Sequence, residues 1–405
     1  MNRVVSSSAA AAAFLAFASS LVAQNCYDNP TQCFSFAPEP EDAGRVESGL
    51  GLRSKQLTIT GDFRLRVRSA ETTAAAPYGP TGDNDQQAMR ARIQFAYQAN
   101  EKVKAFVEVN LAETWAGSDP YSDALRNENY NKISQAYVQV DDMFGFQEKW
   151  RVGRSEYILA NGLVLGSCDY LQYPSTFTGV WVSRNFWGHD LEAFVLDDYG
   201  PLQTPVDGTR YVGGTGKANI CKEGPLETVS PYYMAGTRDG DTVSEDQWLG
   251  VDATGSLPKV FGWNAGWADR IVDGGEDRMA YRAQVYRKFE GVLSQVALTR
   301  TDADGAMHVN PADFASAGLL HQYAGAWRSN LDTWQLGVDM KPGCGVDLNV
   351  TLLTLDRDGT AAQQGHFEFD IRAGKKLDSG VHVSAAYGRD NDDREVVFAQ
   401  LTVFF

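Results

Sequence analysis

Residues 345–353, GVDLNVTLL, alternate between apolar and polar side chains along the whole stretch. Successive side chains of a β-strand point to opposite faces of a sheet, so this pattern predicts a strand with one apolar face and one polar face. The apolar face carries Val346, Leu348, Val350 and Leu352, and the polar face carries Asp347, Asn349 and Thr351.

The same alternation recurs in segments far apart in the chain, including LTITGDFRLRVR at 57–68, QAMRARIQFAYQA at 87–99 and HFEFDIRAG at 366–374. Strands of soluble sandwiches usually span ~5 to 6 residues, whereas a tilted strand needs about 10 to cross a bilayer. The segments have the longer length. We therefore predict an all-β protein, a transmembrane antiparallel up-and-down β-barrel.

The connectors support this prediction, because long and short ones alternate as they do in outer-membrane barrels. The Gly-rich stretch 210–220 supplies the strand that keeps the number of strands even, at about 18. The expected strands lie near residues 57–69, 88–99, 103–114, 131–141, 149–157, 177–187, 189–199, 210–220, 227–238, 247–256, 260–270, 277–289, 292–302, 332–341, 345–355, 365–375, 381–388 and 394–405.

Composition and the first residues indicate where the protein works. Residues 1–23 have the pattern of a secretory signal peptide, 24–56 are expected to form an N-terminal periplasmic segment, and 57–405 the barrel. No later apolar run approaches the ~18 residues of a spanning helix. The net charge of −16 argues against a nucleic-acid partner. We expect the protein in the outer membrane of a diderm bacterium, with lipid around it.

Reactive side chains give little support for an enzyme or a cofactor. The five histidines are scattered, the acidic loops do not fit a calcium-binding loop, and no serine lies in a nucleophile elbow. We therefore expect no metal, no cofactor and no enzymatic activity, although a barrel-borne hydrolase remains a distant alternative. Cys26 and Cys33 are close enough in sequence to pair in an oxidising compartment, while Cys168, Cys221 and Cys344 are expected to be isolated thiols.

Placing the apolar faces against lipid turns the alternate residues toward the lumen. The early strands then carry a basic wall and the late strands an acidic one, although the arginines could also serve only to brace the barrel with lumen carboxylates such as Asp62 and Glu108. Arg154 reaches the lumen only if Gly153 forms a bulge. The basic wall comprises Arg64, Arg66, Arg68, Arg90, Arg92, Lys104, Arg151 and Arg154, and the acidic wall Asp339, Asp347, Glu368 and Asp370.

Aromatic residues near the predicted strand ends suggest the interfacial girdles of a membrane barrel. Ordinary β-propensity of aromatic residues is the alternative explanation. The expected lipid-facing set is Tyr97, Trp150, Trp181, Trp187, Tyr281, Trp334 and Tyr387.

Two segments resemble the alginate-export family of bacterial outer-membrane barrels: residues 151–182, beginning RVGRSEY, and residues 318–342, beginning GLLHQYAGAW. The strands GDFRLRVRS and MRARIQF are similar in style. The resemblance implies a monomeric 18-stranded barrel whose lumen arginines draw a polyanionic uronate chain outward, and it carries over Arg151, Gly153, Arg154, Gly162 and the basic pair of strands. Ser155 stands where the family usually has Gln, so we expect the general class of barrel rather than alginate export itself.

The sequence thus favours a channel for small anionic solutes or polysaccharide, through an arginine-lined lumen. A plugged structural or adhesion barrel is the alternative, and the oligomeric state is open. The final residues 399–405, AQLTVFF, are expected to form the closing strand, with Gln400 and Thr402 toward the lumen. The terminal Phe405 resembles the signal by which barrels are handed to the outer-membrane assembly machinery.

Overall fold

The computed structural model describes residues 52–53, 56–72, 82–83, 86–116, 129–159, 164–165, 176–199, 209–238, 246–257, 259–272, 277–304, 331–357, 366–391 and 394–405. The expected signal peptide and the Cys26–Cys33 pair lie outside these residues, as does Cys168. Cys221 and Cys344 are exposed free thiols. No helix in the described ranges is long and apolar enough to cross a membrane.

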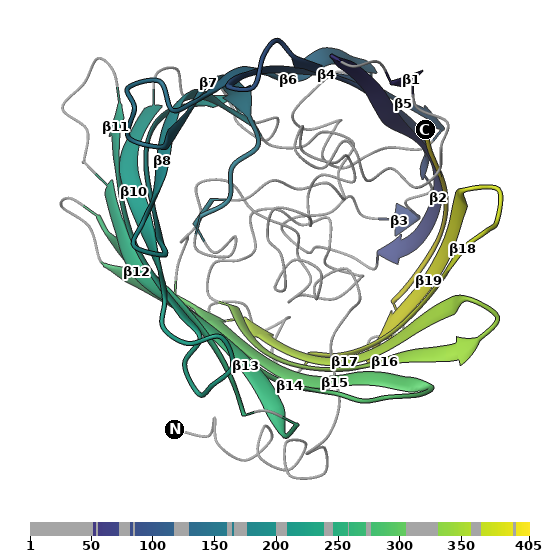
Figure 1. The fold of residues 1–405 in the computed structure, drawn as a ribbon. Helices are drawn as coiled ribbons and strands as arrows, with labels where there is room; N and C mark the ends of the chain where they lie inside the picture. The colour runs from purple at the N-terminus through teal and green to yellow at the C-terminus, as the bar shows by residue number, and fades with distance from the viewer. Residues whose placement is uncertain are drawn as a thin grey trace.

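The described chain forms one antiparallel sheet that closes into a barrel (Figure 1). Of its 20 strands, β1 and β3 are two-residue pieces beside β2, which leaves 18 in the wall. The strands are β1 Leu52–Arg53, β2 Leu57–Thr72, β3 Gly82–Asp83, β4 Gln86–Gln98, β5 Val103–Ala116, β6 Asn129–Asp141, β7 Glu148–Ser155, β8 Thr176–Phe186, β9 His189–Tyr199, β10 Thr209–Asn219, β11 Thr228–Arg238, β12 Asp246–Leu257, β13 Phe261–Ile271, β14 Arg278–Lys288, β15 Leu293–Ala303, β16 Leu331–Gly343, β17 Val346–Arg357, β18 His366–Lys376, β19 Val381–Asp390 and β20 Glu395–Phe404.

Each wall strand pairs with its neighbours in sequence, and the last strand closes the ring on the first. β20 pairs with β2 from Asp62–Phe404 to Ala70–Val396, and Phe405 continues the ladder through backbone hydrogen bonds to Gly61 of 2.8 and 3.0 Å. The predicted barrel and its strand number are confirmed, including the Gly-rich strand β10, which pairs with both β9 and β11.

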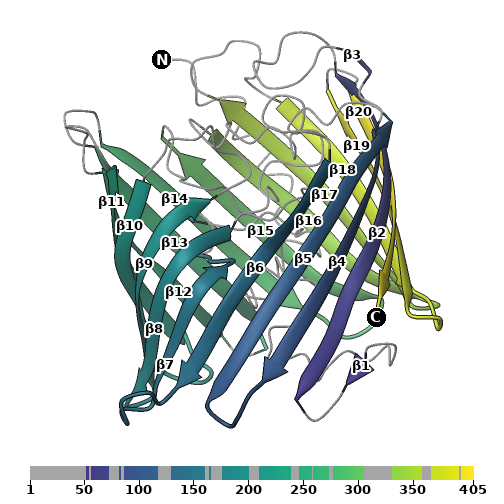
Figure 2. The ribbon, with the colours of Figure 1, turned by 90° about the horizontal axis from the view of Figure 1, so that it is seen from above.

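Tight turns gather at one end of the barrel, where Phe405 also lies (Figure 2). Trp187 and Gly188 join β8 to β9 with positive φ values of 53° and 83°, and Cys344 and Gly345 join β16 to β17 with 55° and 69°. Two central residues with positive φ are typical of the two-residue hairpin whose twist matches antiparallel strands. Because short turns are periplasmic in bacterial barrels, this end faces the periplasm.

The two faces of the wall reverse the pattern of a soluble protein. On β2, the inward side chains of Arg64, Arg66 and Arg68 are buried, whereas the outward Val67 is 54% exposed. On β4, Arg90 and Arg92 are buried while Tyr97 is 43% exposed. Polar side chains enclosed by the ring and apolar side chains on its outer surface are the arrangement that a lipid-embedded barrel requires.

The inner face is not polar everywhere. Inward residues of β8–β12 form an apolar cluster with residues of the β7–β8 connector: Leu159, Val164, Leu165, Phe177, Trp181, Phe194, Leu196, Tyr211, Tyr232, Met234 and Trp248. The expectation that Trp181 faces lipid is therefore wrong. Trp181 is 4% exposed and pairs with the inward residue Phe194. The sequence pattern did not show this orientation, because β8 and β9 carry apolar residues on both faces.

Candidate functional site

The candidate site is the basic part of the inner wall, built by β2 and its neighbour β4. Arg64, Arg66 and Arg68 follow one another at every second position of β2, and Arg90 and Arg92 do the same on β4. The register places Arg64 directly opposite Arg90, and Asp62 directly opposite Arg92. The alternation of the sequence and the pairing of two neighbouring strands thus bring these arginines together.

Asp62 is the carboxylate that binds this cluster. Its Oδ2 lies 2.6 Å from Nε of Arg92 and its Oδ1 lies 3.5 Å from a terminal nitrogen of Arg90. All three side chains are at most 1% exposed. Like charges placed directly opposite each other destabilise a strand pair, so the facing pair Arg64–Arg90 depends on nearby negative charge.

Polar contacts continue on both sides of the cluster. Arg66 donates two hydrogen bonds to Oε1 of Gln400 on β20, of 3.0 and 2.8 Å, and lies over the ring of Phe398. The amide of Gln94 on β4 donates to Glu108 on β5 at 2.6 Å, and the hydroxyl of Ser134 on β6 donates to the same carboxylate at 2.6 Å. Neutral donors rather than arginines hold Glu108.

Lys104 and Arg151 also lie on the inward face, farther around the wall. Nζ of Lys104 lies 4.0 Å from the carboxylate of Asp141. The guanidinium of Arg151 stacks on the ring of Tyr137, 4.7 Å from its centre. Arg151 pairs with the inward residue Gln139, so its position agrees with that of the basic wall.

Arg154 does not belong to this wall. The described pairing of β7 with β6 and β8 contains no register shift at Gly153, although that glycine has a φ of 133°. Arg154 consequently pairs with Ala136 and Thr178 on the outer face and donates to the hydroxyl of Thr178 at 3.4 Å. The bulge required to turn Arg154 inward is absent from these strands.

The acidic residues of the late strands lie on the inward face as well. Asp339 accepts a hydrogen bond of 2.8 Å from Asn349, and Glu368 and Asp370 are 3% and 1% exposed. Asp347 lies near the periplasmic turn, 3.8 Å from Nζ of Lys341. Only β19 and β20 separate β18 from β2, which corresponds to about 14 Å along the wall. The two walls therefore adjoin rather than face each other across the lumen.

Sequence reasoning missed the segment that covers part of the lumen. After β7, Leu159 and Leu165 form a bridge, and both pack on the inward apolar cluster of β8–β12. The hydroxyl of Tyr157 donates a 2.5 Å hydrogen bond to Glu192 on β9. The apolar residues of this connector were the only sign in the sequence that it packs inward, and such a run looks the same as a strand. Within the described ranges, His, Cys, Asp and Glu form no cluster suited to a metal ion.

Comparison with solved structures identifies the architecture. The chain superposes on outer-membrane proteins of Pseudomonas aeruginosa: OccK2 (OpdF) in complex with glucuronate, with a TM-score of 0.63, 15% identity, and coverage of 86% of this chain and 98% of that one. OpdK with vanillate gives a TM-score of 0.60 at 15% identity, and OccK8 (OprE) gives a TM-score of 0.62 at 14% identity. Each of these two matches covers 86% of this chain and 98% of the other chain. Comparison with curated protein sequences finds no match.

Fold and wall together define an outer-membrane β-barrel channel of the porin class. The family model for alginate export matches residues 55–267, more than half of the 405 residues. The chain belongs to the alginate-export family, as its resemblance in sequence predicted.

Proposed function

We propose that the protein is an anion-selective channel for small carboxylated solutes, with the arginines of β2 and β4 as its recognition site. The observation that carries this proposal is the facing pair Arg64–Arg90, flanked by Arg66, Arg68 and Arg92 on one side of the lumen. A barrel that needed charges only for bracing would place acids opposite bases, as Asp62 and Arg92 are placed.

The mechanism is electrostatic and involves no covalent step. Guanidinium groups bind carboxylates through paired, charge-assisted hydrogen bonds, and rows of them on successive inward positions let an anion pass from one to the next. The arginines of β2 and β4 are 0–6% exposed. A carboxylate that binds them must therefore exchange its hydration water for protein groups.

The relatives support the class of solute. OccK2 was solved with glucuronate and OpdK with vanillate, and each of these ligands carries a carboxylate. The acidic residues Glu368 and Asp370, about 14 Å from β2 along the wall, would oppose a long polyanion more than a small one. We infer that monomeric or short uronates fit this lumen better than an extended alginate chain.

Single-channel recording in planar bilayers tests the proposal. Under a salt gradient, the wild-type channel is expected to show a reversal potential of the anion-selective sign, and the double variant Arg64→Gln/Arg90→Gln a shift toward cation selectivity. Arg287→Gln, an outward arginine on β14, is the matched control and should leave the reversal potential unchanged. Added glucuronate should reduce the current of the wild type and not that of the double variant.

An electrically silent barrel would instead support the plugged structural or adhesion protein, consistent with the connector that packs on the inner wall. A conducting barrel whose selectivity does not respond to the double variant would overturn the role of the arginines and leave the channel class intact. Blockade by uronate oligomers stronger than by glucuronate would favour polymer export.

A further inference from the structure

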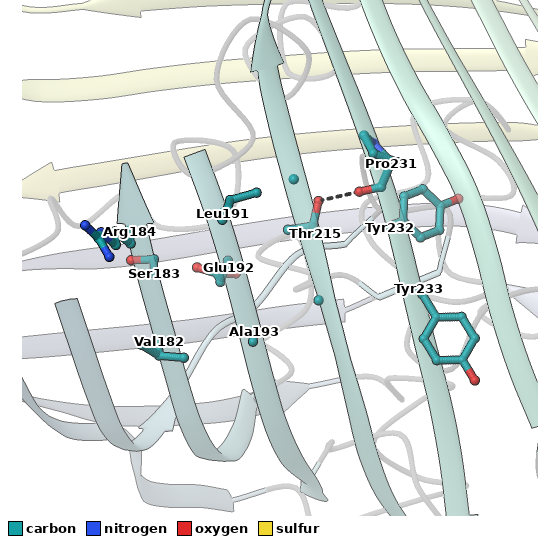
Figure 3. Close-up of a pocket in the computed structure, with 12 residues that line it drawn as sticks. Val182, Ser183, Arg184, Leu191, Glu192, Ala193, Thr215, Pro231, Tyr232 and Tyr233 are labelled. Atoms are coloured by element: carbon teal, nitrogen blue, oxygen red, sulfur yellow. Dashed lines mark hydrogen bonds between the residues drawn. The ribbon is translucent and has the colours of Figure 1, made fainter. Parts of the chain in front are cut away.

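The outer surface of β8–β11 carries a groove that the channel function does not use (Figure 3). It has a volume of about 620 Å³, within the ~300–1,000 Å³ typical of ligand sites. Its lining comes from four neighbouring strands: Val182, Ser183, Arg184, Leu191, Glu192, Ala193, Gly214, Thr215, Gly216, Pro231, Tyr232 and Tyr233.

The register shows that the groove opens toward lipid. Ser183, Glu192, Thr215 and Tyr232 point inward, and two outward rows flank them: Arg184, Leu191, Gly216 and Pro231 on the periplasmic side, and Val182, Ala193, Gly214 and Tyr233 on the other. A lumen pocket over the same strands would instead be flanked by inward residues such as Trp181 and Phe194. These are absent from the lining.

The groove is deep along β10 because that strand has no outward side chains there and its pairing with β11 is interrupted. Gly214 and Gly216 occupy outward positions on β10, where a barrel usually presents apolar side chains to lipid. Pro231 has no N–H, and the pairing of β10 with β11 stops at Thr215–Tyr232 and resumes at Ala218–Val229. The hydroxyl of Thr215 donates to the carbonyl of Pro231 at 3.2 Å, as Figure 3 shows.

Arg184 supplies a positive charge at the periplasmic end of this apolar groove. It is exposed, and its guanidinium carbon lies 5.8 Å from the ring centre of Phe146 and 5.4 Å from that of Phe186. Its register partner Glu148 directs both carboxylate oxygens to backbone N–H groups, of Phe144 at 2.6 Å and Phe146 at 2.9 Å. No ion pair joins Arg184 to a carboxylate within the described chain.

Exposed aromatic side chains fix the depth of Arg184 in the membrane. Phe144 and Phe146 are 61% and 60% exposed on the β6–β7 turn, and Trp187 is 86% exposed on the β8–β9 turn. Aromatic rings at strand ends mark the level of the lipid headgroups. A cation held between two rings at that level meets phosphate groups on one side and acyl chains on the other.

We propose that the groove binds one phospholipid of the periplasmic leaflet, whose phosphate pairs with Arg184 and one of whose acyl chains lies over Gly216 and Gly214. Arginine suits this role because its planar guanidinium can donate two parallel hydrogen bonds to a phosphate while it stacks on aromatic rings. The outward apolar rows contact the chain, and the missing side chains on β10 give it room.

Native mass spectrometry of the detergent-solubilised full chain tests this, with phosphatidylglycerol and the diacylglycerol of the same chains as probes. The wild type should bind phosphatidylglycerol about tenfold more tightly, a difference of about 1.4 kcal/mol. Arg184→Gln should reduce the affinity for phosphatidylglycerol to that for diacylglycerol. Gly216→Leu should weaken both lipids, because the new side chain fills the groove.

The matched control is Arg287→Gln, because Arg287 is also outward, near a periplasmic turn and stacked on one ring, that of Phe289 at 5.1 Å. It should bind both lipids as the wild type does. Equal affinity of the wild type for the two lipids, or an equal loss in Arg287→Gln, would overturn the proposal. The comparison of the two lipids on the wild type needs no variant. Neither that comparison nor the one with Arg287→Gln depends on the conductance of the pore.

Discussion

Removal of the carboxylate of Asp62 is the sharpest test of the basic wall. Asp62→Asn keeps the side-chain shape and leaves the guanidinium groups of Arg90 and Arg92 without the ion pairs that they make at 3.5 and 2.6 Å. With an effective dielectric constant of about 20, each attraction is worth roughly 5 to 6 kcal/mol before desolvation is subtracted. Breaking a buried pair from one side costs about 3–5 kcal/mol net, and we expect a loss of that size in the free energy of unfolding.

The measurement is urea unfolding of the protein in phosphatidylcholine vesicles, followed by tryptophan fluorescence. Asp142→Asn is the control: its ion pair with Lys102 has the same nitrogen–oxygen distance of 2.6 Å, but it lies exposed on periplasmic turns, so its loss should be small. A loss for Asp62→Asn no larger than for this control would refute the reasoning that Asp62 compensates the buried arginines.

The anion proposal adds a second expectation for the same variant. If a carboxylated solute occupies the site of the missing carboxylate, glucuronate should stabilise Asp62→Asn more than the wild type. At ten times its dissociation constant, a ligand that binds only the folded state adds about 1.4 kcal/mol. Equal stabilisation of the two proteins would show that the solute does not bind at Arg90 and Arg92.

Further predictions concern the barrel seam and the periplasmic turns. Gly61→Val should prevent closure of the barrel, because a Cβ would lie 2.1 Å from a carbonyl oxygen of β4 and 2.8 Å from the ring of Phe405. The heat-modifiable band on an SDS gel reports the folded barrel and should be lost in this variant. The control Gly374→Ala, where only side chains lie near the new Cβ, should keep that band. Deletion of Phe405 should slow membrane assembly. Phe405→Ala keeps the backbone hydrogen bonds to Gly61, so it separates recognition of the aromatic side chain from closure of the barrel seam. Unchanged assembly of both variants would remove the role of Phe405 as a signal. The hydrogen bond from Lys102 holds the pKa of Asp142 below its ordinary 3.8, and the same bond raises the pKa of Lys102 above 10.5. The difference in stability between the wild type and Asp142→Asn should therefore be constant from about pH 5 to 9. It should vanish as the pH falls through the lowered pKa of Asp142 and shrink as the pH rises through the raised pKa of Lys102. A difference that stays constant as the pH falls below 3.8 would contradict this assignment.

The strands were predictable because each one repeats a period of two over a length that soluble sheets rarely use. Face assignment succeeded on β2 and β4, where arginines alternate with apolar residues, since only one face of such a strand tolerates lipid. It failed for Trp181, because residues 193–196, AFVL, and the strand before them carry apolar residues on both faces. It failed for Arg154 because a glycine with positive φ does not by itself insert a residue into the ladder.

Contacts between strands could not be predicted from any one strand. That Arg64 faces Arg90, and not an acid, depends on the register of β2 and β4, which the turn lengths and the closing pair with β20 set together. A register shifted by two residues would place Arg64 opposite Arg92 and Asp62 opposite Gln94, removing the pairing that holds Arg92. In the observed register Asp62 faces Arg92 while Arg64 faces Arg90, so an ion pair and a pair of like charges lie side by side on the inner wall. Such a local conflict costs stability, and an anion in transit would relieve it.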